Sequence, residues 1–394
     1  MVPQHHQTSE FETSGLHAAE ASELGCVVSG LVSTGHEGTP DAESLRTRLQ
    51  RTGGRGLRRA ARVVAALDRA RWRSAVALHR SAEPDDPPTE PIALCAVISH
   101  WRSDRPDGDD RFWCLRQVVE SLLAMHLDRV VVVVLTNDVG DAHRDLTKLV
   151  SDHGPDDVIV RVAHTDDVID RRRLREVVVV RWNPGLVRRH GYYLTWGHKQ
   201  LLRKAARSGL FSHLAYLEDD MRLTDAHLDY WCRYRRSLAR LGMLPGFVRV
   251  EERDGSRYVV DQVGPVDPTR RFTAVVPGDL CDQFVQLPFP YQGMYLLDRP
   301  LWVDHFRFSP ARSAFRSRAL PGGVRERAAA GPIYDAPPPG FEARNVVPVR
   351  VGDGASLEPA CLIDHVSGTY SRDPSEAWGT VPLDALFTRV PTST

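Results

Sequence analysis

The sequence predicts an α/β fold in which helices cover both faces of a largely parallel β-sheet. From about residue 92 to residue 220, short apolar runs typical of strands alternate with longer segments of helical spacing. One of these runs, Arg129–Thr136, contains five consecutive valines, as expected of a strand buried on both faces. Strands that alternate with helices in this way pair in parallel through right-handed crossovers.

The predicted elements follow in chain order. Strands are expected at residues 92–99, 129–136, 158–162, 176–181 and 214–217, and helices at residues 111–126, 141–153 and 196–208. Past residue 240, residues 247–252 and 257–262 are expected to pair around a turn at Asp254 and Gly255. Residues 291–297 form a strand that runs into a helix begun by Asp298, with Pro300 in its first turn. This second, smaller half is expected to hold a mixed sheet.

Composition narrows the function classes. The 394 residues are 42% hydrophobic and carry a formal net charge of zero, so no overall field favours nucleic acid or an anionic membrane. The six cysteines include no C-x-x-C pair, which argues against a zinc ribbon or a disulfide framework. No apolar run approaches ~20 residues, and the N-terminus shows no apolar stretch typical of a secretory signal. We therefore expect a cytoplasmic protein.

The N-terminal part differs from the rest. Residues 1–50 are polar and are expected to be a disordered tail, followed at residues 51–90 by a basic helix and a proline-rich linker. Eleven arginines against one acid between residues 46 and 80 suggest either peripheral contact with an anionic membrane or a solvated helix on the catalytic domain, and we favour the second. The domain proper is expected at residues 91–380, with a tail at 381–394.

The most informative segment joins an apolar strand to three consecutive acids. Residues 214–217 lead directly into Glu218, Asp219 and Asp220. Ligands in open α/β sheets sit beyond the carboxyl ends of the strands, and a divalent cation would relieve the repulsion among three carboxylates there. The alternative is a solvated acidic turn that caps the next helix, with Thr224 as N-cap and Asp225 in the first turn.

A family resemblance favours the cation site. The run Tyr-Leu-Glu-Asp-Asp-Met at residues 216–221, followed by an aromatic-rich helix, resembles the DXD-type motif of GT-A fold glycosyltransferases, many of which carry it as Glu-Asp-Asp. The stretch is similar to that of inverting N-acetylglucosaminyltransferases. The resemblance extends over roughly residues 92–370 and is specific at the acidic motif and near the C-terminus. It implies a Rossmann-like, mostly parallel sheet with a smaller acceptor-side half.

The resemblance also implies a Mn²⁺ or Mg²⁺ cofactor bridging the phosphates of a nucleotide sugar. The last acid of the motif, Asp220, would bind the metal, and Glu218 would face the ribose or a metal-bound water, with Asp219 in the less certain middle position. The histidine in Asp364-His365-Val366 matches the late histidine that completes the metal site in many members. A histidine that only forms a hydrogen bond at a strand end is the alternative for His365.

The nucleotide is expected at the ends of the first two strands. His100 and Trp101 follow the first, and Asn137 and Asp138 follow the second, where either could read the base. Asn and Asp also favour such turns for purely local reasons. Lys199, at the start of the helix before the acidic strand, is a candidate for phosphate contact at a helix N-terminus.

An inverting transfer needs a general base for the acceptor hydroxyl. The candidates by position in the family are Glu326 and Asp304. Where the family often has Glu-Asp, this chain has Glu-Arg, so an ordinary surface glutamate is the competing interpretation of Glu326. Arg325 or Arg327 would instead contact the diphosphate. A retaining transfer would need no such base.

The expected function is therefore transfer of a hexosyl or N-acetylhexosaminyl group from a nucleotide-diphosphate sugar, with UDP the first choice, to an unknown glycan, lipid or small-molecule hydroxyl. The alternatives are a sugar-phosphate nucleotidyltransferase and an inactive binding protein of the same fold. We favour the nucleotidyltransferase less, because that class usually has a glycine-rich loop after its first strand and residues 99–102 have none.

Overall fold

The structure is a computed structural model that describes residues 91–102, 112–153, 155, 157–182, 191–267, 271–273, 283–308, 314, 317, 320–351, 355–372 and 377–387. The chain divides into two compact units, Met1–Val64 and Ala65–Thr394, and all described residues belong to the second. The expected tail, basic helix and linker at residues 1–90 therefore lie outside the described residues. Within the described ranges, no helix is both long and apolar enough to span a bilayer.

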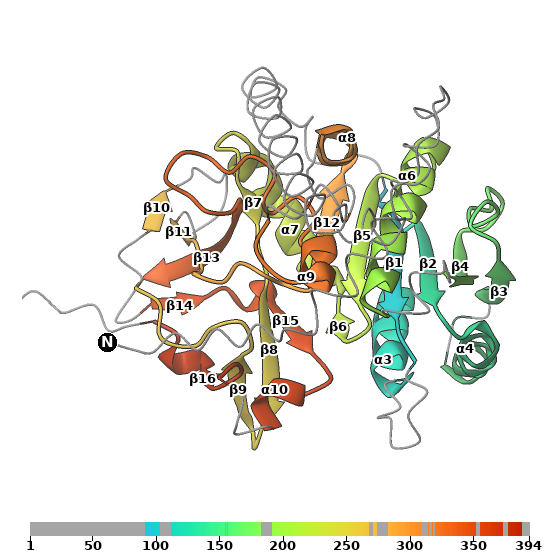
Figure 1. Cartoon of the computed structure of the whole chain (residues 1–394), viewed down its shortest axis with the longest axis horizontal. Helices are drawn as coiled ribbons and strands as arrows, with labels where there is room; N and C mark the ends of the chain where they lie inside the picture. The colour runs from blue at the N-terminus through green and yellow to red at the C-terminus, as the bar shows by residue number, and fades with distance from the viewer. Residues whose placement is uncertain are drawn as a thin grey trace, which may run out of the picture. The chain divides into compact units, whose positions relative to one another are not determined.

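A central sheet of six strands, in the order β12-β5-β1-β2-β4-β3, organises the described part of the chain (Figure 1). β1, β2, β3, β4 and β5 are mutually parallel, and only β12 runs antiparallel, along β5. The predicted, largely parallel sheet is confirmed. The strands are β1 Ala93–His100, β2 Arg129–Thr136, β3 Ile159–Ala163, β4 Arg175–Arg181, β5 His213–Glu218 and β12 Met294–Asp298.

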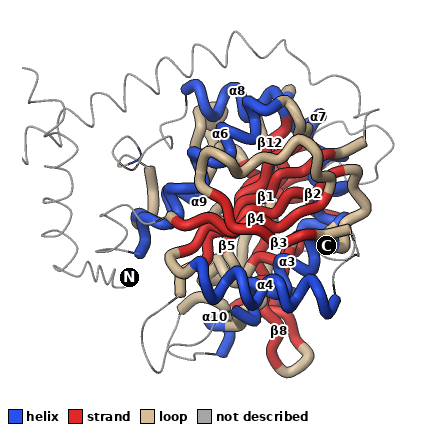
Figure 2. Tube along the Cα trace, turned by 90° about the vertical axis from the view of Figure 1, so that its right-hand side faces the viewer, coloured by secondary structure: helices blue, strands red, loops and turns tan. Residues whose placement is uncertain are grey.

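Helices cover both faces of this sheet, as the alternating pattern predicts. Figure 2 shows α6 and α8 on one side of the strands and α3 and α4 on the other. The helices are α3 Phe112–Leu123, α4 Val139–His153, α6 His198–Ser208, α7 Asp225–Ala239, α8 Arg299–Phe308, α9 Val324–Ala329 and α10 Thr369–Arg372, with 3₁₀ turns η1 Gly191–Gly197, η4 Pro359–Cys361 and η5 Leu383–Ala385. The expected helix at 196–208 thus begins as the 3₁₀ turn η1.

The rest of the described chain forms two smaller mixed sheets, where one mixed half was expected. The first joins β10 Arg271–Thr273, β11 Gln283–Val285, β13 Asn345–Val351, β14 Ala355–Leu357 and β7 Leu244–Pro245. The second has the order β16-β9-β8-β15-β6, namely Val381–Pro382, Ser256–Val259, Val248–Arg253, Leu362–His365 and Met221–Arg222. In it β15 runs parallel to β8 and antiparallel to β6.

Local signals explain two boundaries near the acidic motif. Asp254 and Gly255 both have positive φ, 52° and 73°, as a two-residue type I′ hairpin turn between β8 and β9 requires. Thr224 caps α7: its side chain meets the His227 backbone, and the His227 ring Nδ1 accepts the Thr224 backbone N–H at 3.0 Å. The predicted turn and cap are confirmed.

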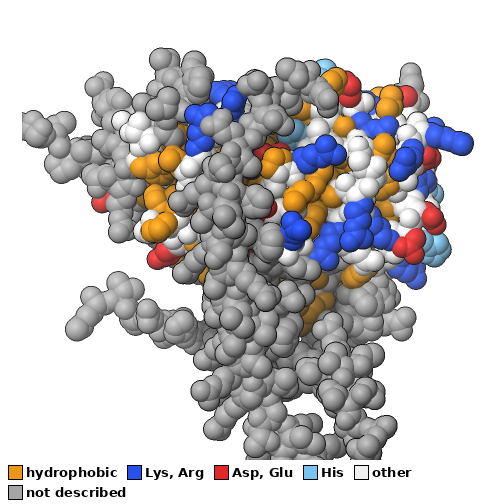
Figure 3. Space-filling model, turned by 90° about the horizontal axis from the view of Figure 1, so that it is seen from above, with side chains coloured by type: hydrophobic (Ala, Val, Ile, Leu, Met, Phe, Trp, Pro, Cys, Tyr) orange, Lys and Arg blue, Asp and Glu red, His pale blue; other side chains and the backbone are white. Residues whose placement is uncertain are grey.

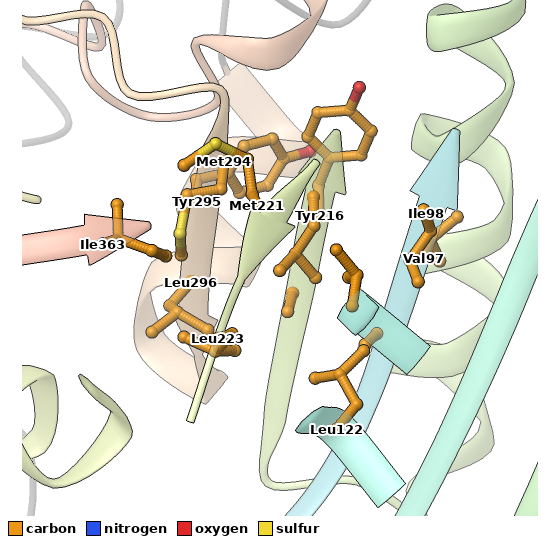
Figure 4. Close-up of a cluster of buried hydrophobic side chains, with 14 of the residues drawn as sticks. Val97, Ile98, Leu122, Tyr216, Met221, Leu223, Met294, Tyr295, Leu296 and Ile363 are labelled. Atoms are coloured by element: carbon orange, nitrogen blue, oxygen red, sulfur yellow. The ribbon is translucent and has the colours of Figure 1, made fainter. Parts of the chain in front are cut away.

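Buried side chains fix the acidic motif at both of its ends (Figure 4). Tyr216 on β5 and Tyr295 on β12 are opposite each other across the strand pair, with ring centroids 5.6 Å apart, and neither is more than 1% exposed. Met221, which directly follows the three acids, is fully buried and begins β6. Burying each such side chain contributes about 1.5–3 kcal/mol, so the acids between them are held at the edge of the core.

Candidate functional site

The acidic motif lies at the switch point of the central sheet. The chain builds β2, β3 and β4 on one side of β1 and then returns to place β5 on the other side. Ser99 at the end of β1 pairs with Glu218 at the end of β5, so the residues that follow each strand meet at the same edge. This is where ligands bind in open α/β sheets.

The three consecutive carboxylates are buried and point to three different partners. Glu218, Asp219 and Asp220 are only 8%, 9% and 5% exposed. Asp219 Oδ2 lies 2.7 Å from His100 Nδ1, which joins the ends of β5 and β1 across the switch point. The alternative of a solvated acidic turn is therefore wrong, because each acid is taken up by protein groups instead of water.

Asp220 lies beside His365, a contact that fits both the metal pair implied by the resemblance and the alternative of a histidine hydrogen-bonded at a strand end. His365 Nε2 lies 3.0 Å from Asp220 Oδ2. The pairing of β15 with β6 sets this contact, because it places His365 opposite Met221, and Val366 N–H donates to the Asp220 carbonyl at 2.9 Å. The other ring nitrogen, Nδ1, lies 2.6 Å from Glu251 Oε1.

The charges around His365 decide its protonation. Burial would lower the pKa of this imidazole, but Asp220 and Glu251 on its two nitrogens outweigh burial and raise the pKa to about 9. Glu251 in turn accepts the Ser371 backbone N–H, and these partners lower the pKa of its carboxyl despite the opposing effect of burial. Glu251 therefore stays ionised and fixes the orientation of the His365 ring.

With a pKa of about 9 the His365 ring is protonated on both nitrogens near neutral pH, and Nε2–H donates to Asp220. A divalent cation that displaced this proton would find Asp220 and His365 at the spacing of two ligands and would take its remaining ligands from phosphate and water. Two ligands at about 2.1 Å and a right angle lie about 3 Å apart, which matches the Asp220–His365 spacing. A carboxylate that holds Nδ1–H, as Glu251 does, leaves Nε2 as the ligand atom. Among the described residues no group of three or more His, Cys, Asp or Glu side chains gathers as a complete metal site. Among the described residues, Asp220 and His365 are therefore the two candidate ligands.

Glu218 is held by its own protein. Tyr291 Oη–H donates to Glu218 Oε1 at 2.7 Å, Arg325 Nε lies 3.5 Å from the same oxygen, and Arg249 Nη1 lies 3.8 Å from Oε2. Burial raises the pKa of Glu218, with Arg325 opposing. Residue 293 is a glycine with a positive φ of 62°. A Cβ at this position would come within 2.9 Å of Glu218 Oε2, so the carboxylate needs a glycine beside it. Glu218 accordingly holds Tyr291 and two arginines at the end of β5, and its expected role toward a ribose or a metal-bound water stays a prediction.

The residues expected to bind the nucleoside differ in whether other protein groups already occupy their side chains. The Asn137 amide spans the Arg102 backbone, accepting its N–H and donating to its carbonyl, both at 2.9 Å. Asp138 Oδ1 accepts the Asp141 backbone N–H at 3.3 Å and so caps α4. These are the local turn roles that Asn and Asp commonly play. Trp101 is 40% exposed, and its ring lies against Gly191, where a Cβ would come 2.9 Å from Cε2.

Lys199 does not reach the carboxylates. It lies on the buried face of α6, 4% exposed, where Nζ donates to Tyr295 Oη at 3.1 Å and lies 3.3 Å from His305 Nε2. His305 Nδ1 lies 2.7 Å from the Asp335 carboxylate. Burial lowers the pKa of Lys199 to about 7, with Asp335 opposing. The structure gives the side chain an interior role, and the expected phosphate contact has no support in its position.

The two candidate bases lie in different places. Glu326 is in the first turn of α9, next to Arg325, and its Oε1 lies 3.9 Å from the Arg325 Nε that reaches Glu218. Asp304 lies on α8, which directly follows β12. Because Asp298 at the end of β12 pairs with His213 at the start of β5, α8 begins at the opposite end of β5 from the carboxylates. The charge of Asp304 acts on Arg344. The structure brings Glu326 to the motif and does not bring Asp304 there.

Several residues of the site were missed by sequence reasoning. Arg249 and Glu251 alternate with valines on β8, yet they are 4% and 2% exposed. Arg249 forms a bidentate pair with Asp261, and its guanidinium lies 4.9 Å from the centre of the Tyr291 ring. The alternation of charged residues with valines on this strand could have indicated a buried ion-pair network, because a buried strand carries ionised side chains only when they are paired.

A shallow groove between α6 and α8 lies elsewhere. Its lining residues are Arg203, Ala206, Arg207, Trp302, Val303 and Phe306. The view from above, toward the side where Figure 1 places α6 and α8, shows basic side chains beside hydrophobic ones (Figure 3). These residues of α6 belong to its C-terminal half, toward the start of β1, since Ser212 N–H donates to Ala93 O. The groove is thus away from the carboxylates at the other end of β5.

Comparison with known proteins gives little. No family model matches the sequence, and no curated protein matches it. Forty-nine chains of solved structures match in fold comparison. One is the apo crystal structure of mouse xyloside xylosyltransferase 1, a glycosyltransferase, with a TM-score of 0.31 and 11% identity over 62% of this chain and 82% of that one. A likeness at this TM-score carries no argument, so the proposals below rest on the site.

Proposed function

We propose that this chain is a metal-dependent glycosyltransferase that moves a sugar from a nucleotide-diphosphate sugar, UDP in the first instance, to a hydroxyl acceptor. The observation that carries the proposal is the Asp220–His365 pair, 3.0 Å apart and backed by Glu251, at the switch point of a parallel sheet. A carboxylate and a neutral imidazole at the open edge of the sheet suit a cation that must also bind phosphate oxygens.

The bound cation would supply Lewis-acid stabilisation for the departing diphosphate. Asp220 contributes the anionic oxygen and His365 the Nε2 donor, while Glu251 retains the Nδ1 proton. We assign Arg325 to the diphosphate as well. Its Nε lies 3.5 Å from Glu218 at the end of β5, and its side chain is 43% exposed, so the guanidinium is both tied to the acidic motif and open to a phosphate.

His100 and Trp101 are assigned to the nucleoside side of the site. Trp101 is a largely exposed aromatic ring at the end of β1, beside the His100–Asp219 contact. An aromatic face of this kind can stack on a base or ribose. Asp219, whose role the resemblance leaves less certain, would act through His100 by holding its ring.

Glu326 is assigned as the general base of an inverting transfer. It follows Arg325 on α9 and its side chain is 39% exposed, so we expect it to meet an acceptor hydroxyl next to the diphosphate site. Asp304 has no comparable position and is not assigned a step.

The test is a binding screen of UDP, GDP, ADP and their sugars on the whole protein, with and without Mn²⁺. A bound ligand raises the melting temperature by mass action. We expect one nucleotide to raise it only when Mn²⁺ is present, and its sugar to be hydrolysed slowly without an acceptor. If no nucleotide stabilises the protein with either Mn²⁺ or Mg²⁺, the proposed function is wrong.

A further inference from the structure

An aromatic pair, the exposed Phe289 and the half-buried Trp378, flanks the candidate site. The rings of Phe289 and Trp378 meet edge to face, with centroids 5.0 Å apart and an interplanar angle of 83°. Phe289 is 42% exposed. Aromatic pairs of this geometry ordinarily stabilise cores, and large rings left open to water on a protein surface commonly mark a binding site.

The backbone on both sides of the pair is fixed. Gln262, 1% exposed, donates its side-chain N–H to the Phe289 carbonyl at 3.0 Å. Gly379, next to Trp378, donates to the Val260 carbonyl at 3.2 Å. The backbone that carries each ring is therefore bonded to residues 260–262, just past β9, and β16 pairs with β9 beyond Gly379 (Figure 1). Rings held in this way lose little freedom when a ligand binds.

The pair is continuous with the carboxylate site. Tyr291, two residues after Phe289, donates to Glu218. On the Trp378 side, a Cβ on Gly379 would come 2.8 Å from the Cβ of Tyr370, so the two segments are in contact. The Tyr370 ring lies 5.5 Å from the His365 ring. Two short routes of aromatic side chains thus connect the aromatic pair to Glu218 and to the Asp220–His365 pair.

The chemistry around the rings favours a sugar over an apolar ligand. A pyranose offers a face of C–H groups to an aromatic ring and a rim of hydroxyls to polar neighbours. Polar groups lie near the pair in the fold: Gln262 donates to the Phe289 carbonyl, and Asp261, directly before it, pairs with Arg249. The Arg249 guanidinium in turn lies 6.0 Å from the ring of the half-buried Tyr370, which is beside Gly379. A lipid surface would require a contiguous apolar patch of several hundred Å².

We propose that Phe289 and Trp378 form a platform for a sugar unit of the acceptor, so that the acceptor is a glycan. This inference rests on the proposed function, because the platform lies beside the proposed transfer site. The ring that accepts the transferred sugar would lie between the platform and the Asp220–His365 pair, with a neighbouring sugar unit stacked on the aromatic rings.

The experiment uses the full chain and four defined probes: the tetrasaccharides of cellulose, chitin, xylan and amylose type. Binding is measured by saturation-transfer NMR with Mn²⁺ and the nucleotide identified above. We expect at least one tetrasaccharide to bind, and Trp378→Ala and Phe289→Ala each to weaken it by about tenfold or more, as loss of a central aromatic contact does. Trp378→Phe should retain most of the affinity.

The control is Trp113→Ala. Trp113 is 40% exposed on α3, so it matches Trp378 in residue type but has no contact with the platform. The acceptor KM should rise in the platform variants while donor hydrolysis without acceptor stays within about twofold, because neither ring touches the assigned metal or diphosphate residues. If Trp378→Ala melts early, Phe289→Ala alone decides, since an exposed ring contributes little to the core.

The outcomes are separable. Intact Mn²⁺–nucleotide binding with no tetrasaccharide bound, or with binding unaffected by both alanine variants, overturns the platform and leaves the proposed function standing. Binding of phosphatidylglycerol vesicles that is lost in the same variants would also overturn it, in favour of a lipid surface. Absence of nucleotide binding in the parent protein overturns the proposed function itself.

Discussion

His365 Nε2 lies 3.0 Å from Asp220 Oδ2, although one residue ends β15 and the other follows β5. The contact is made by the second mixed sheet, whose strand β6 begins one residue after Asp220 and pairs with β15. The same sheet contributes Glu251 from β8 to the other side of the imidazole. The candidate metal pair therefore depends on two sheets that meet at the acidic motif and share one hydrophobic core.

Asp220→Asn should abolish metal-dependent nucleotide binding and leave the fold intact. The amide keeps the size of the side chain but cannot supply an anionic ligand, so we expect Mn²⁺-dependent affinity for UDP to fall by more than about tenfold. Calorimetric titration with and without Mn²⁺ measures this. Asp152→Asn, at an exposed position of α4, is the matched control. Equal Mn²⁺-dependent affinity in both variants would remove Asp220 from the metal site.

Glu251→Gln should weaken metal binding without removing a ligand. The glutamine can no longer hold His365 as a carboxylate does, and loss of such a supporting group typically costs about 10–100-fold in metal affinity. Nucleotide affinity measured without metal should stay unchanged. Glu252→Gln is a close control because Glu252 is adjacent in the chain and exposed. A variant that loses metal-free and metal-dependent affinity alike would indicate a general structural role for Glu251.

The central sheet could be predicted from the sequence because its strands are nearly continuous apolar runs. β2 was predicted exactly, since five valines leave no other element, and β5 was marked by the apolar run before Glu218. The start of α6 was not predicted. The chain is still in the 3₁₀ turn η1 at Gly197, which packs so closely on Leu135 that a Cβ would come 2.7 Å from its side chain. That constraint comes from tertiary packing, which periodicity does not contain.

The site was predictable only in part. His100, Asp219, Asp220 and His365 come together as expected, because strand ends of a parallel sheet share an edge and the resemblance supplied the histidine. Asp304 was misplaced because the direction of β12, antiparallel to β5, decides where α8 begins, and no local pattern encodes that direction.

Lys199 was misplaced for a local reason. Its rarity suggested function, but it belongs to the buried face of α6 together with Leu202. Three-residue spacing from Leu202 was the available sign that this lysine faces the protein interior.

Arg325→Gln should lower affinity for nucleoside diphosphate specifically. The guanidinium is assigned to the diphosphate, so UDP binding should weaken by about tenfold while uridine binding is unchanged, because uridine has no phosphate. Arg327→Gln is the control on the same helix, where Nη1 donates to the Gly322 carbonyl at 3.0 Å. Competition titrations with uridine, UMP and UDP would measure the difference. A loss that is equal for uridine and UDP would contradict a phosphate contact.

Glu326→Gln should lower kcat for transfer and spare donor binding. Removing a general base typically costs about 10²–10⁴-fold in rate. Asp304→Asn should be close to the parent, because Asp304 lies at the start of β5 rather than at its carboxyl end. The measurement is transfer kinetics once an acceptor is known. Full activity of Glu326→Gln would favour a retaining transfer or a base outside α9.

Lys199→Met should stabilise the protein near pH 7 and flatten its stability profile above that pH. Burial lowers the pKa of Lys199 from 10.5 to about 7, so between those values the unfolded chain binds a proton that the folded chain does not. The free energy of unfolding then rises with pH across this window, by at most about 1.4 kcal/mol per unit, and this slope disappears below pH 7, where the amine is protonated in both states. Methionine has no charge to bury and fills a similar volume.

Urea unfolding at pH 6, 7, 8 and 9 would measure how stability changes with pH. Lys148→Met, at an exposed position of α4, is the control and should keep the slope of the parent. The same slope in Lys199→Met and the parent would mean that the buried amine stays protonated beside Tyr295 and His305 throughout this range.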